Sequence, residues 1–233
     1  EITSFYLKPE DGKPLPEFQA GQYISIKVRI PDSEYTHIRQ YSLSDMPGKD
    51  YYRISVKKDG AVSSYLHEGL HEGDSLEISA PAGDFVLDSS SRKDLVLLSA
   101  GVGITPMISM LKTSVSKQPE RQILFIHAAK NSEYHALRDE AEEAAEHSSV
   151  KTAFVYREPT EEDRAGDIQF HEGQIDQQFL KSLIANTDAD YYICGSPSFI
   201  TQMHKLVSEL GSAPESIHYE LFGPQLSIAQ SIS

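Results

Sequence analysis

The sequence predicts two domains, an antiparallel β-barrel or sandwich followed by a doubly wound α/β domain. The 233 residues suffice for one large domain or two modest ones. Short β-type segments separated by turn residues fill the chain up to about residue 90, whereas strands and helices alternate after residue 93. Short strands at this spacing are typical of barrels, and the alternation is typical of a parallel sheet with right-handed crossovers. We therefore divide the chain into residues 1–92 and 93–233.

The strands of the first half are indicated by β-branched and aromatic residues between turn dipeptides. Asp11-Gly12 and Asp59-Gly60 are typical turn sequences. Apolar and polar residues alternate for much of residues 23–30, as in a strand with one buried face. The expected strands are residues 2–7, 23–30, 40–43, 51–57 and 75–78.

The second half combines apolar strand segments with helical ones. Residues 106–115 place Met107, Met110 and Leu111 on one side of a helix. Residues 157–173 are polar and acidic, and we interpret them as a loop. The expected strands are residues 95–99, 123–128, 150–156, 191–194 and 217–221, and the expected helices are residues 106–115, 134–147, 175–184 and 199–210.

Composition argues against several classes of function. Asp and Glu outnumber Lys and Arg by 35 to 21, and this net charge of −14 argues against nucleic-acid binding. The single cysteine, Cys194, excludes an intramolecular disulfide and an iron–sulfur cluster held by cysteines, and we expect a reducing, cytoplasmic compartment. The longest apolar run, residues 95–98, is far shorter than the ~20 residues that span a bilayer. Because the chain opens at Glu1 without Met, we expect a fragment of a longer protein.

Two glycines follow the first expected strand of the second half. Gly101 and Gly103 would let the backbone approach a phosphate at the start of the next helix. Thr105 suits the N-cap of that helix, and Pro106 suits its first turn. The third glycine of the usual dinucleotide fingerprint is absent. A tight structural turn therefore stays an open alternative.

Polar and aromatic residues gather in two segments of the first half. Arg39 can pair with a pyrophosphate, Tyr41 offers a ring for stacking, and Ser42 can form a hydrogen bond to a ring heteroatom. In a strand, Arg39 and Tyr41 would share a face. Residues 60–66, which include Ser63, are expected to form a turn that opens a short helix and offers amides to a pyrophosphate. Taken alone, the first segment is better explained as an ordinary strand.

Five short motifs follow one another in a fixed order along the chain. They are Arg39-x-Tyr41-Ser42, Gly60-x-x-Ser63, Gly83-Asp84-Phe85, Gly101-x-Gly103-x-Thr105-Pro106 and Cys194-Gly195-x-Pro197. That order resembles the ferredoxin–NADP reductase superfamily, and the resemblance covers nearly the whole chain. It implies a six-stranded antiparallel FAD barrel followed by an NAD(P) domain with a five-stranded parallel sheet. Residues 2–9, 125–131 and 218–224 are most similar to the reductase module of flavohaemoglobins.

The resemblance implies a function for the chain. In flavohaemoglobins a globin domain precedes the reductase module, and the whole protein acts as a nitric oxide dioxygenase. This chain would then be a monomeric oxidoreductase that transfers a hydride from NAD(P)H to FAD and single electrons to the haem of a globin outside this sequence. The implied cofactors are FAD and NAD(P)H, with no metal site in the chain itself.

The resemblance also implies roles for individual residues. Tyr41 would cover one face of the flavin, with Ser42 near its N5 atom, while Phe222 would cover the other face and Glu220 would lie at the flavin edge. These four are the expected catalytic residues. Besides Tyr41, Ser42 and Phe222, the expected cofactor-binding residues are Arg39, Leu43, Ser44, Val56, Lys57, Gly60, Val62, Ser63, Ser64, Gly101, Gly103, Thr105, Pro106, His127, Arg157, Cys194, Gly195, Pro197 and Gly223.

The choice between NADH and NADPH stays open at the level of sequence. No acidic residue stands clearly at the end of the second strand to bind a ribose 2′-hydroxyl. Lys130 and Arg157 are candidates to meet a 2′-phosphate, although solvated surface charge explains them equally well.

Other interpretations compete with the leading one. The segment from His67 to His71 matches the H-E-x-x-H motif of zinc proteases, but Gly69 weakens a helix there and turn residues follow at once. Cys194 is equally well explained as a small apolar residue at a strand end. The rival functions are a stand-alone flavin or oxygenase reductase and a non-catalytic flavoprotein-like module. The intact motifs argue against the second.

Overall fold

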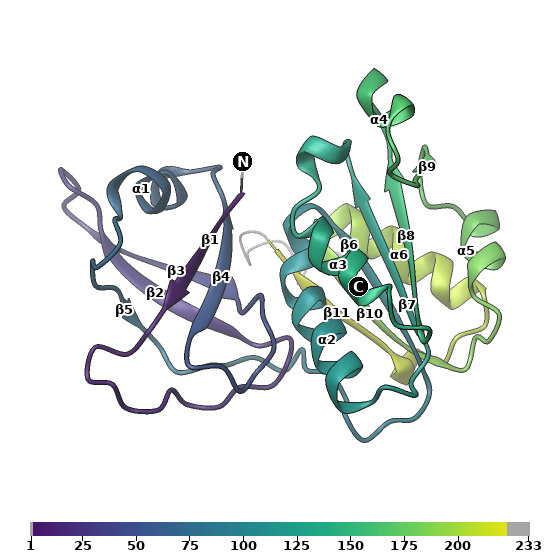
Figure 1. The fold of residues 1–233 in the computed structure, drawn as a ribbon, viewed down its shortest axis with the longest axis horizontal. Coiled ribbons are helices and arrows are strands. Elements are labelled where there is room, and N and C mark those ends of the chain that lie inside the picture. The colour runs from purple at the N-terminus through teal and green to yellow at the C-terminus, as the bar shows by residue number, and fades with distance from the viewer. Residues whose placement is uncertain (1, 223–233) are drawn as a thin grey trace, which may run out of the picture.

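The computed structural model describes residues 2–222, which form two halves lying side by side (Figure 1). The first half holds antiparallel strands and one helix, and the second holds a parallel sheet with helices on both faces (Figure 1). The predicted fold class is therefore confirmed. The exact boundary between residues 92 and 93 stays a prediction.

The first half consists of two small antiparallel sheets. Strand β1 (Ile2–Leu7) pairs with β4 (Tyr52–Lys57), and β2 (Tyr23–Arg29) lies between β3 (Thr36–Ser42) and β5 (Glu77–Ile78). A bridge between Leu43 and Ile54 joins the two sheets.

The sixth strand implied for the barrel is reduced to an isolated bridge. Ala82 pairs with Tyr23 and exchanges two backbone hydrogen bonds with it. Pro81 has no N–H to extend this pairing, and Gly83 turns the chain with a φ of 111°. Five regular strands and this bridge therefore stand where six strands were expected.

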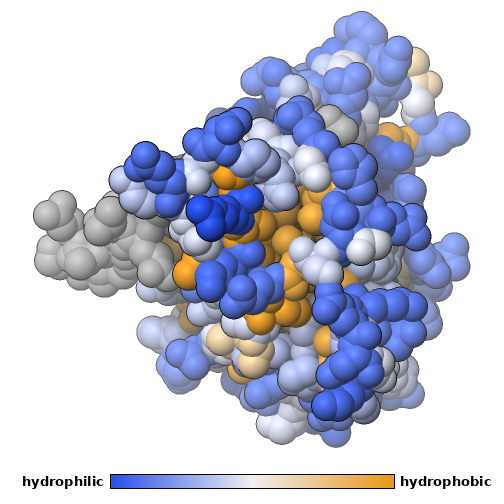
Figure 2. Space-filling view, turned by 90° about the vertical axis from the view of Figure 1, so that its left-hand side faces the viewer, coloured by the Kyte–Doolittle hydropathy of each residue, from blue (hydrophilic) through white to orange (hydrophobic). Residues whose placement is uncertain are grey.

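The core of the first half follows the alternation of its strands. Ile24, Ile26 and Val28 point inward from β2, and helix α1 (Ala61–Gly69) adds Val62 and Leu66. Seen from the side of this half, apolar residues gather at the centre of the face and hydrophilic ones surround them (Figure 2). The core residues Ile24, Ile26 and Val28 themselves are buried.

The second half is built on a six-stranded parallel sheet. Its order is β11-β10-β6-β7-β8-β9. The five expected strands are all present, and the sixth, β9, pairs two residues with Val155 and Tyr156. The strands are β6 (Asp94–Ala100), β7 (Ile123–Ala129), β8 (Val150–Tyr156), β9 (His171–Glu172), β10 (Ala189–Gly195) and β11 (Ile217–Leu221).

Helices cover both faces of this sheet (Figure 1). Helices α2 (Ile104–Lys117) and α3 (Arg138–Ala144) bury residues in the core on one face, and α5 (Gln177–Leu183) and α6 (Pro197–Glu209) do so on the other. The second half also contains three short 3₁₀ segments, η1 (Gly101–Gly103), η2 (Ser132–Tyr134) and η3 (Pro214–Ser216).

The segment expected to be one loop, residues 157–173, contains a short helix, α4 (Glu161–Ala165), besides β9. The Thr160 hydroxyl accepts a hydrogen bond from the Asp163 N–H, and the Asp163 carboxylate accepts one from the Thr160 N–H. This capping box explains why the helix starts there.

Side chains of the second half form hydrogen bonds with the backbone of the segment that connects the two halves. The Gln118 side-chain amide donates to the carbonyl oxygens of Ser89 and Ser91, both at 2.9 Å. Arg121 is buried, donates to the Lys93 carbonyl oxygen at 2.7 Å and pairs with Asp190 at 2.7 Å. The linker is therefore anchored to the α/β half. Among residues 2–222 no helix has the length and apolar character to cross a membrane.

Candidate active site

A large cleft lies where the carboxyl ends of the parallel strands face the first half. Its volume is about 1160 Å³. From the second half, residues at the ends of β6, β7, β8 and β10 form its walls, as the topology of an open α/β sheet requires. From the first half, Ile2, Ser4, Lys57 and Asp59 face the same space. Both halves therefore contribute to one site.

Glycines lie in the wall of the cleft and directly behind it. A Cβ atom at Gly103 would lie 2.3 Å from the Cys194 carbonyl oxygen, so the turn after β6 packs directly on the end of β10. Gly101 has a φ of +56°, and a Cβ there would meet no atom within 4 Å. Gly101 and Gly195 both line the cleft. The backbone is therefore bare where a ligand would approach, as a dinucleotide phosphate requires.

The start of helix α2 corrects one expectation. The helix begins at Ile104 with Gly103 at its N-cap, and the Thr105 hydroxyl donates to the Val102 carbonyl oxygen at 3.0 Å. Thr105 is thus buried inside the first turn and is not the N-cap. Pro106 lies in that first turn, as predicted, where its missing N–H costs no hydrogen bond.

On the barrel side, Arg39 and Tyr41 lie on one face of β3. Their partners on β2 are Ile26 and Ile24. Arg39 is exposed, and Tyr41 is half-buried. Burial raises the pKa of Tyr41, the charge of nearby Asp59 adds to the increase, and Arg39 opposes it. Tyr41 thus lies within electrostatic reach of both Arg39 and Asp59, and Asp59 belongs to the wall of the cleft.

The end of β11 holds a largely buried acid, and the aromatic residue that follows the strand lines the cleft. Glu220 pairs in register with Cys194, and burial raises its pKa to about 7. Burial, with the charge of Glu220 as a second cause, raises the pKa of the Cys194 thiol well above its usual value. Phe222 lines the cleft and donates its N–H to the Gly195 carbonyl oxygen at 3.3 Å. The cleft therefore has an aromatic wall, and burial raises the pKa of the carboxyl group two residues before it.

Cationic and aromatic side chains form the outer rim of the cleft. The Lys130 ammonium lies 5.4 Å from the ring centroid of Tyr134, a cation–π distance. Glu158 approaches Lys130 at 3.5 Å and Arg157 at 3.7 Å. Lys130, Tyr134 and Arg157 all line the cleft. The Glu158 carboxylate thus partly neutralises the positive charges of both Lys130 and Arg157.

Comparison with known proteins decides the family. A model described as an oxidoreductase FAD-binding domain matches residues 2–87, and one described as an oxidoreductase NAD-binding domain matches residues 97–205. The solved flavohaem-like FAD/NAD-binding domain of nitric oxide dioxygenase from Vibrio cholerae O1 biovar El Tor is 36% identical, with a TM-score of 0.87; the match covers 96% of this chain and 93% of that one. The chain belongs to this family of flavohaem-type FAD/NAD-binding reductase domains.

Two further relatives are longer than this chain. The flavohaemoprotein of Bacillus subtilis (strain 168) is 92% identical over 232 residues, which cover 100% of this chain and 58% of that protein. The flavohaemoglobin of Malassezia yamatoensis, solved with bound FAD and haem, is 29% identical with a TM-score of 0.81, over 95% of this chain and 56% of that one. The chain thus spans a little over half the length of these flavohaemoproteins.

Two polar groups of the barrel fit the FAD of this family. The Ser42 hydroxyl is buried and makes no hydrogen bond to any residue in the described range, so it is free to meet a ligand. The Ser63 hydroxyl accepts hydrogen bonds from the N–H groups of Asp59 and Gly60 at 2.9 and 2.8 Å and thereby shapes the start of α1. Ser63 therefore orders the turn at Asp59 and Gly60, and Asp59 lines the cleft.

The remaining expected residues differ in burial and in their distance from the cleft. Leu43, Val56 and Val62 are buried in the core of the barrel, and Ser44 and His127 are buried with polar partners of the protein itself. Lys57 is exposed and lines the cleft, whereas Gly60 is exposed but is not among the lining residues. Ser64 lies in α1, and Pro197 is the first residue of α6. Gly223 lies outside the described residues. The structure thus brings Lys57, Gly101, Arg157, Gly195 and Phe222 together in the cleft.

The zinc-protease motif does not form a helix of the required length. Helix α1 ends at Gly69, so His71 lies beyond it. His67 Nε2 lies 2.7 Å from the Val56 carbonyl oxygen, Glu68 pairs with Lys58, and His71 Nδ1 lies 3.7 Å from Asp74. The three side chains therefore make separate local contacts.

Some residues of the cleft escaped the sequence interpretation. Asp59, Tyr134, Ser196 and Phe199 all line it. Ser196 was detectable, because it follows Gly195 and accepts a hydrogen bond from the Phe199 N–H as the N-cap of α6. Tyr134 was hidden in the segment expected to be a long helix.

Proposed function

We propose that this chain is the electron-input module of a flavohaemoprotein, which passes electrons from NAD(P)H through FAD to the haem of a globin domain and so supports nitric oxide dioxygenation. The observation that carries the proposal is the cleft shared by both halves, which is lined by Lys57 and Asp59 on the barrel side and by Gly101, Gly195 and Phe222 on the other. The 92% identity to the Bacillus subtilis flavohaemoprotein supports the same assignment. We also propose a monomer located in the cytoplasm, for which the single, buried cysteine is suitable.

The residues of the chain supply position and electrostatics. Bound FAD supplies the electron-accepting ring that takes a hydride and releases single electrons. Tyr41 would cover one side of the flavin, Ser42 would offer it an unpaired hydroxyl, and Phe222 would cover the opposite side in the absence of nicotinamide. Holding two rings in contact can lower a barrier by about 7–11 kcal/mol at best. Glu220, which titrates near neutral pH, is able to hold or release a proton beside this position.

Replacing Tyr41 by Ala is expected to weaken FAD retention, because the half-buried ring would no longer cover the flavin. Replacing Ser42 by Ala is expected to leave FAD bound but to slow flavin reduction roughly tenfold, the effect of one lost hydrogen bond of ~1.4 kcal/mol. Stopped-flow reduction and the flavin content after gel filtration measure both effects. Flavin reduction unchanged in both variants would defeat the proposed roles.

Replacing Phe222 by Ala is expected to ease nicotinamide access and to change the ratio of kcat/KM for NADPH to that for NADH. Phe222 lines the cleft, so removal of its ring would open space there for the nicotinamide. Leu221→Ala, one residue away, serves as the control for local packing loss. An unchanged specificity ratio in Phe222→Ala would count against this gating role.

The experiment for the whole proposal uses a haem acceptor. Purified chain loaded with FAD is mixed anaerobically with NAD(P)H and a ferric globin domain from a flavohaemoprotein, and the haem spectrum is followed. We expect haem reduction that requires both the chain and the nucleotide. A flavin that is reduced while the haem stays ferric would instead indicate a stand-alone flavin reductase.

A further inference from the structure

Two separate sets of contacts join the halves, and the first is apolar. Ala20, Phe85 and Leu87, from the barrel half, belong to the core that α2 covers in the other half. The ring of Phe85 meets that of Tyr192 edge-on, with centroids 5.6 Å apart. Apolar contact is non-directional. It keeps the halves together but does not by itself set how one is rotated against the other.

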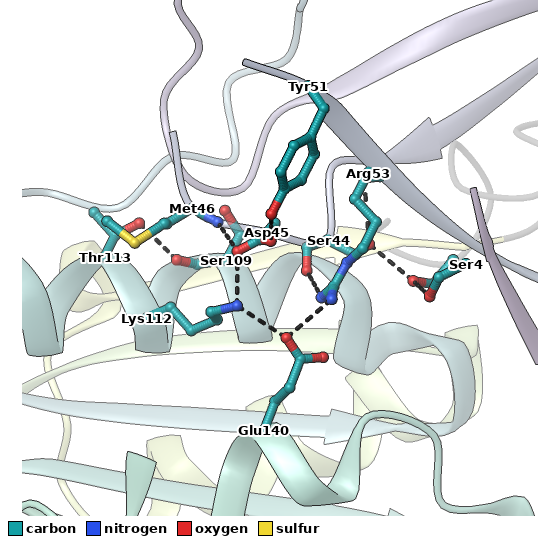
Figure 3. A network of polar contacts seen from close by, with 11 residues as sticks. Ser4, Ser44, Asp45, Met46, Tyr51, Arg53, Ser109, Lys112, Thr113 and Glu140 are labelled. Atoms are coloured by element: carbon teal, nitrogen blue, oxygen red, sulfur yellow. Dashed lines mark hydrogen bonds and ion pairs between the residues drawn. The ribbon is translucent and has the colours of Figure 1, made fainter. Parts of the chain in front are cut away.

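The second set is a cluster of four charged side chains (Figure 3). Lys112 Nζ, on α2, lies 2.7 Å from Asp45 Oδ1 of the barrel half and 2.9 Å from Glu140 Oε1 of α3. Arg53 Nη1, on β4, lies 2.9 Å from the same Glu140 oxygen. Asp45 and Glu140 balance Lys112 and Arg53, so the cluster is neutral. Two of its three ion pairs cross from one half to the other.

The barrel members of the cluster are themselves held in place. The Tyr51 hydroxyl donates to Asp45 Oδ2 at 2.7 Å, and Arg53 Nε donates to the Ser44 hydroxyl at 3.1 Å. Burial alone would raise the pKa of Asp45, but hydrogen bonds from Lys112 and Tyr51 outweigh it and lower the pKa. Burial would lower the pKa of Lys112, but its bonds to Asp45 and Glu140 raise it. The carboxylate of Asp45 and the ammonium group of Lys112 thus each stabilise the charged form of the other.

The cost of such a cluster indicates what it contributes. Arg53 and Asp45 are buried, and Glu140 and Lys112 are only partly exposed. Removing these charges from water offsets most of their mutual attraction, so a buried ion pair adds little net stability compared with apolar packing. Its hydrogen bonds are, however, directional. The cluster therefore constrains the relative orientation of the halves more than it stabilises them.

The cluster is connected to both walls of the cleft. Residues 133–137 line the cleft and lead directly into α3, where Glu140 follows Leu137 by one turn. Leu137 has a φ of 54°, and this left-handed residue sets the direction in which the helix leaves the wall. On the other side, Arg53 lies in the same strand, β4, as Lys57, which also lines the cleft.

We propose that Asp45, Arg53, Lys112 and Glu140 form an interdomain clamp that fixes the separation and rotation at which the nicotinamide and flavin subsites face each other. The four are positioning residues for hydride transfer, since none of them lines the large cleft. The proposal rests on the proposed function for its kinetic consequence but not for its structural one.

The kinetic test breaks both cross-domain links. In the double variant Lys112→Gln, Glu140→Gln, both side chains stay polar and lose their charges. We expect the rate constant of flavin reduction at saturating NAD(P)H to fall ~10–100-fold, because misplacement by about 1 Å costs that much. We expect FAD content and nucleotide Kd to change by less than about threefold. Glu143→Gln, exposed on the same helix, is the matched control and should match the wild type.

A conservative variant at Lys112 distinguishes a positioning role of the cluster from a loss of folded structure. The single variant Lys112→Arg keeps a cation that reaches both carboxylates, so it should keep most of the wild-type rate of flavin reduction. A double variant that reduces flavin at the wild-type rate would overturn the clamp. So would a rate loss that comes entirely from a weaker nucleotide Kd.

A distance measurement tests the clamp without any hydride transfer. Spin labels are attached at Glu34→Cys, in the barrel half, and Lys181→Cys, on α5; both positions are exposed, and the native Cys194 is buried. We expect one narrow distance distribution in the otherwise wild-type chain and a broadened or shifted one in the double variant. Equal distributions in both would overturn the clamp even if the proposed electron transfer is correct. A broadened distribution with no flavin reduction in the wild type would contradict only the proposed function.

Discussion

Replacing Glu220 by Gln is expected to raise the free energy of unfolding at pH 8 by roughly 2–3 kcal/mol and to leave it nearly unchanged at pH 4. Burial raises the pKa of this carboxyl group from 4.5 to about 7 in the folded chain. At pH 4 the acid is neutral in both the folded and unfolded states, so the isosteric amide changes little. At pH 8 the folded chain contains a buried carboxylate that the amide removes.

The sign of the pH dependence follows from proton binding. Between pH 4.5 and about 7 the folded wild type holds more protons at Glu220 than the unfolded chain does, so its stability falls as the pH rises. Urea unfolding of FAD-loaded protein across this range should show that slope, and Glu220→Gln should lose it. Glu215→Gln, an exposed site shortly before β11, should keep the wild-type slope. Parallel slopes in the wild type and Glu220→Gln would show that burial does not shift this group.

Replacing Gly103 by Val is expected to lower the free energy of unfolding by about 3 kcal/mol and to abolish measurable NAD(P)H binding. A Cβ at this position would lie 2.3 Å from the Cys194 carbonyl oxygen and 2.8 Å from the Gly195 nitrogen. These are backbone atoms at the end of β10, so no side chain can rotate away. The two strand ends would have to separate, and the floor of the cleft would open.

The variant Gly101→Ala distinguishes the free-energy cost of a steric collision from the cost of backbone strain. The added methyl group meets no atom within 4 Å, but the residue keeps a φ of +56°. Its expected cost is therefore only the ~1–2 kcal/mol of a left-handed non-glycine residue. Chemical denaturation and nucleotide titration of both variants measure the difference. A Gly103→Val protein that binds NAD(P)H as tightly as the wild type would exclude this role of the glycine.

The sequence predicted the regular elements well, because their signal is local. The strand at residues 150–156 has the predicted bounds, since β-branched and aromatic residues predominate in it. The turn at Gly60 and the short helix after it were also correctly predicted. The Gly101 and Gly103 turn was found for the same reason, although its packing against Cys194 was not visible in the local pattern.

What the sequence could not predict depends on contacts between distant residues. The helix expected over residues 134–147 spans only Arg138–Ala144, and His135 instead lies buried against His127 and Phe154, with ring centroids 4.7 and 4.5 Å away. The Arg53–Glu140 pair joins residues 87 positions apart, and no periodicity reports such a pair. Tertiary packing overrides local preference at both places.

The most direct test of the central claim is anaerobic reduction of the FAD-loaded chain by NAD(P)H. The account predicts that the visible absorbance of the flavin is lost in a single turnover, with one nucleotide oxidised for each flavin reduced. A folded chain that retains FAD but leaves it oxidised in excess NADH and in excess NADPH would contradict the account.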